Sequence, residues 1–428
     1  MEVVTVRRVT RRLVPFLFVL YIANYLDRVN VSFAALQMNR DLGLSATAYG
    51  AGAGIFFVGY CLLQVPSNLL LLRVGARRWL SGLMIGWGVI ATSMMFVRGP
   101  RSFFALRFLL GMVEAGFFPG VILYLANWIP AEARARAVAR FATAVPVAGV
   151  IGGPVSGALL GLEGWGGFAG WQWLFFFEGV PSVLLGAIAL QVLADKPEDA
   201  TWLETEEKAW LTERLRKERS PTTVEGPGSL REALRASVVW RLGLLYFLIV
   251  FGLYGEGLWL PQVIKGSSSL SDLAVGFLTV APAVASALAM AAIAAHSDRT
   301  GERWRHVAWP LVAGTVGFAA AALGRGSPGL ATAALSLAAV GFLGAIGPFW
   351  SIPAGLFSGS AQAGAIAAIN AVGNLAGFLG PYMIGVTRDL TASFAGALAM
   401  MAALMALGAL LAWRLGRRPE FARLAAKR

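Results

Sequence analysis

The sequence predicts an all-α membrane protein whose twelve transmembrane helices form two pseudo-symmetric halves of six helices each. Three observations predict this fold. Hydrophobic residues make up 57% of the 428 positions and charged residues only 14%, whereas a soluble domain carries about 25% charged residues. Twelve apolar segments reach the length of about 20 residues that a spanning helix needs. Two motifs also recur at nearly one offset in the two halves of the chain.

Short loops join most of the predicted spans, and the first span begins close to the N-terminus. The basic run from Arg7 to Arg12 resembles the start of a signal peptide. The apolar segment that follows is long, contains Asp27 and Arg28, and lacks a small-residue cleavage site, so we expect a retained span. The predicted spans are residues 13–36, 48–72, 79–97, 103–127, 137–161, 171–193, 239–261, 272–295, 305–325, 329–352, 361–386 and 392–414.

One long hydrophilic stretch interrupts the spans and divides the chain. We expect a solvated charged helix in it, supported by charge pairs four residues apart, and then a flexible linker. The predicted organisation is a six-helix half at 1–193, a cytoplasmic linker at 194–238 and a second six-helix half with a tail at 239–428.

The distribution of basic residues predicts the orientation in the membrane. Of the 36 lysines and arginines, 28 lie at the termini and in the alternate loops on their side, and six lie in the opposite loops. Loops rich in Lys and Arg stay in the cytoplasm. Both termini and the long linker are therefore expected on the cytoplasmic side of the inner membrane. The net charge of +13 indicates this orientation and not a nucleic-acid partner.

An internal repeat supports the division into halves. The loop after span two contains Arg73, Gly75 and Arg77, and the loop after span eight contains Asp298, Arg299, Gly301 and Arg303. Arg73 and Arg299 are 226 positions apart, and the glycine-flanked Pro154 and Pro381 of spans five and eleven are 227 apart. Tandem halves with a site at their interface are typical of secondary transporters.

Four charged residues lie inside the predicted spans: Asp27 and Arg28 in span one, and Arg107 and Glu114 in span four. Such residues face a bundle interior or an aqueous cavity and have a functional role by default. Neighbours on a helix point about 100° apart, and residues seven apart are separated by about 10.5 Å along the axis. We therefore expect the acids and bases of span one to pair with those of span four around a shared cavity.

This arrangement would couple protons to an anion. Protonation of one acid removes the carboxylate that competes for an arginine, so an organic anion binds better to the protonated site. By linkage, the bound anion also favours protonation. The planar guanidinium fork suits a carboxylate. The alternative is that the four charges are buried ion pairs that only hold helices together.

Several motifs carry a resemblance to a known family. They are Asn24-Tyr25-Leu26-Asp27-Arg28-Val29-Asn30, Pro66-Ser67-Asn68, Arg107-Phe108-Leu109-Leu110-Gly111-Met112-Val113-Glu114-Ala115-Gly116 and Gly347-Pro348-Phe349-Trp350. With the basic loops and the six-plus-six plan, the chain resembles the major facilitator superfamily. The motifs are similar to those of its anion:cation symporter family, which includes permeases for galactonate, tartrate and phthalate and transporters for sialic acid and vesicular glutamate.

The resemblance implies alternating access and proton-coupled uptake of a small organic anion such as a sugar acid, a hydroxy-dicarboxylate or an aromatic acid. It assigns proton coupling to Asp27 and Glu114, and gating to the two basic loops. The residues that it implies for substrate binding are Arg28, Arg107, Tyr25, Tyr60, Trp350, Asn370 and Asn374. The aromatic side chains and the two asparagines can equally be packing or helix-bridging residues.

The sequence departs from the family pattern at two places. Leu72 stands where the loop motif of the superfamily has an Asp, although Asp298 keeps it in the second copy. Val145-Pro146 stands near the position where sugar-acid carriers offer a Gln, which weakens the case for a polyhydroxylated substrate. Glu178 and Glu256 are interpreted as interfacial or packing acids toward helix ends.

Other functions remain open. An anion exchanger or a drug/proton antiporter would use the same fold, and a membrane sensor without transport is a more distant alternative. The sequence contains no HExxH or GxSxG motif within a span, so we do not expect an enzyme. With one cysteine and two histidines, no metal site and no cofactor are expected. The predicted partners are the organic anion, protons and the lipid bilayer, and the expected state is a monomer.

Overall fold

The computed structural model describes residues 2–219, 235–324, 327–357 and 359–418. In these ranges the chain is helical, and twelve segments are long and apolar enough to cross a membrane. The prediction of an all-α protein with twelve spans is confirmed. Each predicted span lies on an observed helical segment. The helices extend beyond several predicted ends because a helix backbone can continue past the apolar segment into water. Helix α1, for example, begins at Glu2.

The first six spans comprise α1 (Glu2–Asp41), α2 (Ala46–Val74), α3 (Ala76–Ser93), α4 and α5 (Pro100–Glu114 and Phe117–Ala126), α6 and α7 (Ala131–Ala142 and Ala144–Leu160), and α8 (Gly170–Val192). The last six comprise α11 (Ser237–Gly266), α12 and α13 (Asp272–Leu278 and Val280–Thr300), α14 (Trp304–Leu323), α15 (Pro328–Leu356), α16 (Gly359–Thr391) and α17 (Phe394–Gly416). Short 3₁₀ turns occur at Met94–Phe96, Trp165–Gly167 and Pro197–Asp199.

Three of the spans are broken into two helices. Around the break between α4 and α5, α2 approaches so closely that a Cβ on Gly116 would lie 1.7 Å from Ser67 Oγ. At the other two breaks a threonine hydroxyl donates to a backbone carbonyl, from Thr143 to Arg140 and from Thr279 to Gly276. Such side-chain bonds compete with the helical ladder. The breaks therefore have local causes in small and hydroxylated residues.

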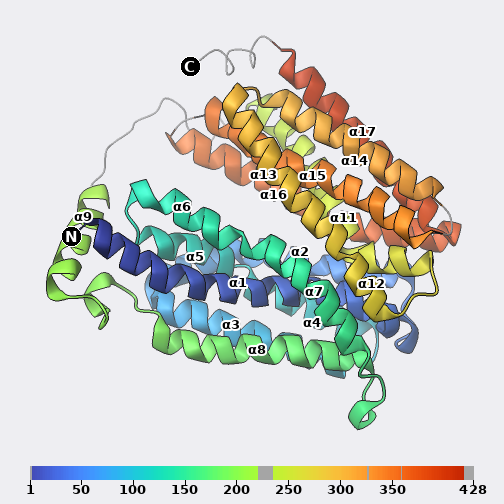
Figure 1. Cartoon of the computed structure of the whole chain (residues 1–428), viewed down its shortest axis with the longest axis horizontal. Helices are drawn as coiled ribbons and strands as arrows, with labels where there is room; N and C mark the ends of the chain where they lie inside the picture. The colour runs from blue at the N-terminus through green and yellow to red at the C-terminus, as the bar shows by residue number, and fades with distance from the viewer. Residues whose placement is uncertain (1, 220–234, 325–326, 358, 419–428) are drawn as a thin grey trace.

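Two six-helix halves form the molecule and meet at one end (Figure 1). Helix α7 of the first half packs on α12, and α2 packs on α16. Glycines permit this approach, since a Cβ on Gly276 would lie 2.2 Å from the carbonyl oxygen of Gly153. Toward the end that carries α9 and the N-terminus, the halves diverge (Figure 1).

Polar contacts hold the halves together where they meet. Gln37 Nε2 donates to Asp272 Oδ2 at 3.0 Å, and Asn39 Nδ2 donates to Gln262 Oε1 at 3.2 Å. Asp389 accepts from the backbone N–H groups of residues 46 and 47. Its carboxylate thereby satisfies the N-terminus of α2, where the helix dipole favours negative charge. This end of the molecule is closed in the structure.

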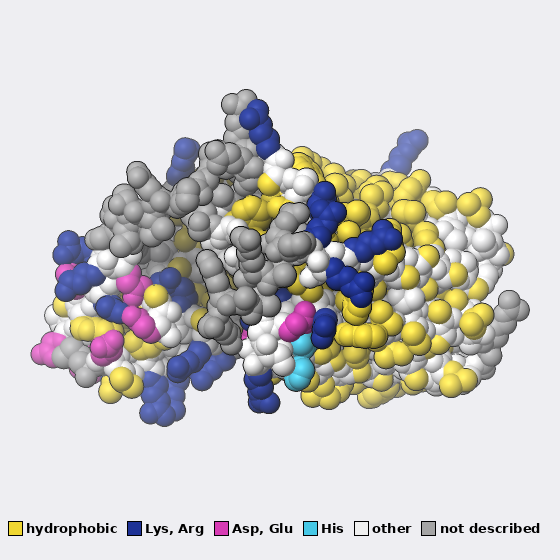
Figure 2. Space-filling view, turned by 90° about the horizontal axis from the view of Figure 1, so that it is seen from above, with side chains coloured by type: hydrophobic (Ala, Val, Ile, Leu, Met, Phe, Trp, Pro, Cys, Tyr) yellow, Lys and Arg dark blue, Asp and Glu magenta, His cyan; other side chains and the backbone are white. Residues whose placement is uncertain are grey.

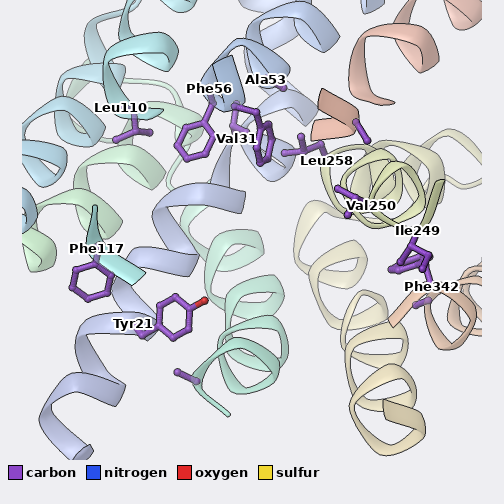
Figure 3. Packing of buried hydrophobic residues seen from close by; sticks show 14 of the residues in the cluster. Tyr21, Val31, Ala53, Phe56, Leu110, Phe117, Ile249, Val250, Leu258 and Phe342 are labelled. Carbon is purple, nitrogen blue, oxygen red and sulfur yellow. The ribbon is translucent and has the colours of Figure 1, made fainter. Parts of the chain in front are cut away.

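The outer surface and the core both fit a membrane protein. Charged side chains gather at the end with the N-terminus and α9 and near the middle of the visible face, while a broad apolar surface covers its other end (Figure 2). Inside, buried residues continue from Phe56 and Val31 of the first half to Leu258 and Val250 of α11 (Figure 3). One apolar core therefore spans both halves at their contact.

The linker contains a charged helix, α9 (Thr205–Arg219), as predicted. Its predicted pairing four residues apart is present between Arg214 and Glu218 at 3.6 Å. Beyond these charge pairs, the charges of α9 also reach the first half. Glu207 pairs with Arg8 at 2.6 Å, and Glu218 pairs with Arg134 at 3.1 Å. Buried apolar residues of α9 add to these contacts, so the helix docks on the bundle.

The exposed face of α9 carries charge pairs of its own. Glu213 accepts from Arg216 at 2.8 and 3.0 Å, and these hydrogen bonds lower the pKa of Glu213. Residues 220–234 of the predicted linker lie outside the described residues. The exact domain boundaries at 193/194 and 238/239 stay a prediction.

The two repeated loops share a backbone feature. Gly75 has φ +91° and Gly301 has φ +69°, a region that favours glycine. In the second loop Asp298 pairs with Arg303 at 2.6 Å. In the first loop, where Leu72 replaces the acid, Asp195 accepts from the backbone N–H of Arg77 at 2.8 Å. The linker thus supplies a carboxylate to the loop that lacks one, while Arg73 and Arg299 remain exposed.

Candidate functional site

Arg28 and Glu114 form the centre of the candidate site. Arg28 projects from α1, and its Nε and Nη2 atoms donate to Glu114 Oε2 at 3.2 and 3.0 Å. Asn24, one turn earlier on α1, donates to the same oxygen at 3.1 Å. Glu114 is fully buried, whereas the Arg28 side chain is 11% exposed. The predicted pairing between spans one and four is present in this ion pair.

Aromatic rings surround the Arg28 guanidinium. Its Cζ lies 5.2 Å from the ring centre of Tyr60 and 5.4 Å from that of Phe56. Such cation–π contacts stabilise a desolvated arginine. The structure therefore places the predicted Tyr60 beside the predicted Arg28, both from helices of the first half.

Asp27 faces away from Arg28. Its Oδ2 atom accepts from Trp87 Nε1 of α3 at 3.2 Å and from the Ser182 hydroxyl of α8. Consecutive residues on a helix point about 100° apart, so Asp27 faces α3 and α8. The expectation that Asp27 would pair with an arginine of span four is wrong, because Trp87 and Ser182 satisfy its oxygen instead.

Arg107 also stands apart from the predicted cluster. It is 1% exposed, its Nη2 donates to the carbonyl of Ala53 at 3.2 Å, and its Cζ lies 5.0 Å from the Phe56 ring centre. Its Nε and Nη1 atoms are buried without a hydrogen bond among the described residues. A closed four-charge cluster is therefore not formed, since Arg107 enters the packing between α4 and α2.

A cavity of about 140 Å³ lies between the two halves. It is lined by Tyr25 and Arg28 of α1, glycines of α7 such as Gly152, and residues of α11, α13 and α15. Tyr254 and Glu256 of α11 line it from the second half. The predicted Tyr25 and Arg28 thus face a space shared by both halves, as a transport site requires.

Three predicted binding residues lie elsewhere. Trp350 packs on the Tyr246 ring with 4.8 Å between the centres. Asn370 and Asn374 lie half-buried on α16, whose glycines at 373 and 377 contact aromatic rings of α11 and α2. None of these three lines the cavity described above. Their part in substrate binding stays a prediction.

Sequence reasoning missed the role of Asn24, and it misplaced Glu178 and Glu256. Asn24 shares a face with Arg28 because it lies four positions earlier, a signal that the sequence offered. Glu178 and Glu256 were expected toward helix ends. They lie instead at least two turns inside α8 and α11. Glu178 accepts from Ser156 at 2.9 Å, and Glu256 lines the cavity. The length of an apolar segment in the sequence does not determine how far the helix continues beyond each glutamate.

The sequence pattern of the Major Facilitator Superfamily matches residues 17–381. The chain belongs to this family. It is a multi-pass membrane transporter and not an enzyme. Among solved structures, it is similar to a bacterial homologue of the human lysosomal transporter Spinster in an inward-facing, unoccupied conformation. That likeness has a TM-score of 0.77 at 18% identity, over 98% of this chain and 96% of the other, and it supports the fold.

Curated relatives cover nearly the whole of this facilitator chain. It is 47% identical to a "Putative tartrate transporter" of Agrobacterium vitis over 97% of this chain and 96% of the relative. It is 38% identical to a "Quinolone resistance transporter" of Acinetobacter baumannii, over 95% and 94%. It is also 37% identical to the inner membrane transport protein RhmT of Escherichia coli, over 94% and 93%.

Proposed function

We propose that this facilitator is a proton-coupled symporter of a small organic anion, of the anion:cation symporter type. The observation that carries the proposal is the Arg28–Glu114 pair at 3.0 Å, with Arg28 in the wall of the cavity between the halves. The relatives named as tartrate transporters favour a tartrate-like hydroxy-dicarboxylate as the substrate.

The pair gives a physical route to coupling. While Glu114 is ionised, its Oε2 atom occupies Nε and Nη2 of Arg28. Protonation of Glu114 weakens this bond and leaves the guanidinium fork free for a substrate carboxylate. Charged hydrogen bonds contribute about 1.5–3 kcal/mol each. The proton and the anion therefore favour each other's binding, as linkage requires.

Asp27 is proposed as a second coupling acid, and Arg107 as a buried cation whose field acts on the same site. Asp27 lies on the opposite face of α1 from the cavity, so we assign it a proton and no substrate contact. With both termini in the cytoplasm, as the basic loops predict, the structure opens inward. Alternating access then exchanges this state with one closed at the α9 end, the protein acting as a monomer in the inner membrane.

Transport into proteoliposomes tests this function. Purified full-length protein should accumulate radiolabelled L-tartrate when the outside is made acidic, and accumulation should stop when a protonophore dissipates the gradient. Accumulation that ignores the pH gradient would reject proton coupling. If the protein takes up another carboxylate and not L-tartrate, tartrate is rejected as the substrate, and the proposed proton-coupled symport is retained.

A second candidate is drug/proton antiport, which the quinolone resistance relative favours. In that case an imposed proton gradient would drive norfloxacin out of the proteoliposomes and leave L-tartrate unmoved. The same vesicles therefore separate the two functions.

A further inference from the structure

Glu256 is a buried acid for which the coupling scheme above has no use. It lies several turns from either end of α11 and is 5% exposed. Its Oε2 atom is buried and has no hydrogen-bond partner among the described residues. This differs from Glu114 and Glu178, each of which accepts at least one side-chain hydrogen bond.

The surroundings of Glu256 contain few groups that can offset a negative charge. On the cavity side the titratable residues are Arg28, Tyr25 and Tyr254, and none of them forms an ion pair or hydrogen bond with it within the described chain. Toward α14, α15, α16 and α17 the neighbouring wall is apolar, with Phe318, Leu335, Ile384 and Met401.

Glu256 lines the cavity and is flanked by two glycines. Gly255 and Gly257 carry no side chains, and a Cβ on Gly257 would meet no heavy atom within 4 Å. A buried carboxylate without a partner is strongly disfavoured relative to the neutral acid. An anion on Arg28 would share the cavity with Glu256 and repel its ionised form. The site therefore favours a proton on Glu256 whenever an anion is present.

We propose that Glu256 is a proton-binding group of the transport cavity, independent of Glu114 and contributed by the second half. A proton from bulk water bonds to a carboxylate oxygen of Glu256 before the anion binds. After the anion leaves, Glu256 releases this proton to bulk water, so charge and atoms balance. The coupling to an anion rests on the proposed function, whereas protonation of the empty site does not.

Infrared difference spectroscopy of the substrate-free, full-length protein tests the protonation. At neutral pH the wild type should show the C=O band of a protonated carboxyl that is missing from E256Q and kept, at a shifted frequency, in E256D. E206Q is the matched control, because Glu206 is an exposed carboxyl on α9 and its loss should not change the band. Equal bands in wild type and E256Q would overturn the proposal.

Calorimetric titration with L-tartrate across a pH series tests the coupling. At alkaline pH, where the infrared band of Glu256 has disappeared from the substrate-free protein, the slope of log Kd against pH should be smaller by one for E256Q than for wild type, since one linked proton is lost. Equal slopes would overturn the coupling of Glu256 to the anion. If the wild type binds no L-tartrate, the proposed substrate fails, and the infrared result alone decides whether Glu256 binds a proton.

Discussion

Arg28 Nη2 lies 3.0 Å from Glu114 Oε2, and this ion pair joins α1 to α4 at the wall of the cavity. Both Nε and Nη2 donate to the same carboxylate oxygen, while Glu114 Oε1 is buried and has no hydrogen-bond partner in the part of the chain that the structure describes. The arginine is thus held in place and is still available to an anion that displaces Glu114.

Arg28→Lys should weaken L-tartrate binding at acidic pH by roughly tenfold or more. Lysine keeps the charge but lacks the planar fork, so at least one charged hydrogen bond is lost, at about 1.5–3 kcal/mol. Calorimetry on the full-length protein measures the change. Arg40→Lys, at an arginine whose side chain is 79% exposed, is the control and should bind normally. Wild-type affinity in R28K would exclude carboxylate clamping by Arg28.

Glu114→Gln should abolish acid-driven accumulation and retain exchange of substrate across the membrane. Glutamine cannot take up the coupling proton, and it no longer competes for Arg28 with a negative charge. Uptake and counterflow assays in proteoliposomes distinguish the two activities. Glu206→Gln on the surface of α9 should behave as wild type. Acid-driven accumulation by E114Q would show that the coupling proton binds elsewhere.

Asp27→Asn should also abolish acid-driven accumulation, but it should leave L-tartrate binding at acidic pH within about twofold of wild type. The reason is that Asp27 contacts Trp87 and Ser182 and does not line the cavity, and changes of a few tenths of a kcal/mol are typical of residues without ligand contact. Binding and uptake are measured on the same preparation. A large loss of binding would place Asp27 in the substrate site after all.

Gly276→Val should hold the molecule away from the closed arrangement at the α7–α12 contact. Even a Cβ at this position would lie 2.2 Å from the carbonyl oxygen of Gly153, so the helices must separate. Pulsed electron spin resonance between labels at Arg40 and Leu273, in a Cys61→Ser background, should show longer distances and reduced transport.

Gly82→Ala is the matched control for this substitution, because a Cβ there meets nothing within 4 Å. Unchanged distances in G276V would mean that the two helices do not need glycine to close.

Glu207→Gln should lower the melting temperature and loosen α9 from the bundle. Glu207 is 5% exposed and forms the 2.6 Å pair with Arg8 of α1. Loss of the charge weakens the ion pair with Arg8 and the hydrogen bond that the buried Thr5 hydroxyl donates to Glu207. Thermal unfolding and hydrogen exchange of α9 measure the effect, with Glu206→Gln as the exposed control. An unchanged exchange rate for α9 would show that other contacts dock the helix.

The local character of the chain was predictable from the sequence. The length of the apolar segments predicted the twelve spans, and the offset shared by the Arg73/Arg299 and Pro154/Pro381 pairs predicted two halves. The acids and bases inside the spans indicated which helices form the site. These features follow from the bilayer as a solvent, which acts on each segment separately. The pairing of Arg28 with Glu114 could also be inferred, because neither residue has an oppositely charged side chain within reach on its own helix.

Only the tertiary structure decided which partner each charged side chain takes. Asp27 pairs with Trp87 and Ser182, and Arg107 bonds to the carbonyl of Ala53, because helix rotation and packing set the direction of every side chain. The same packing placed Glu256 beside the cavity, where its Oε2 atom has no hydrogen-bond partner among the described residues. Sequence spacing fixes directions within one helix, but partners on other helices depend on contacts between segments far apart in the chain.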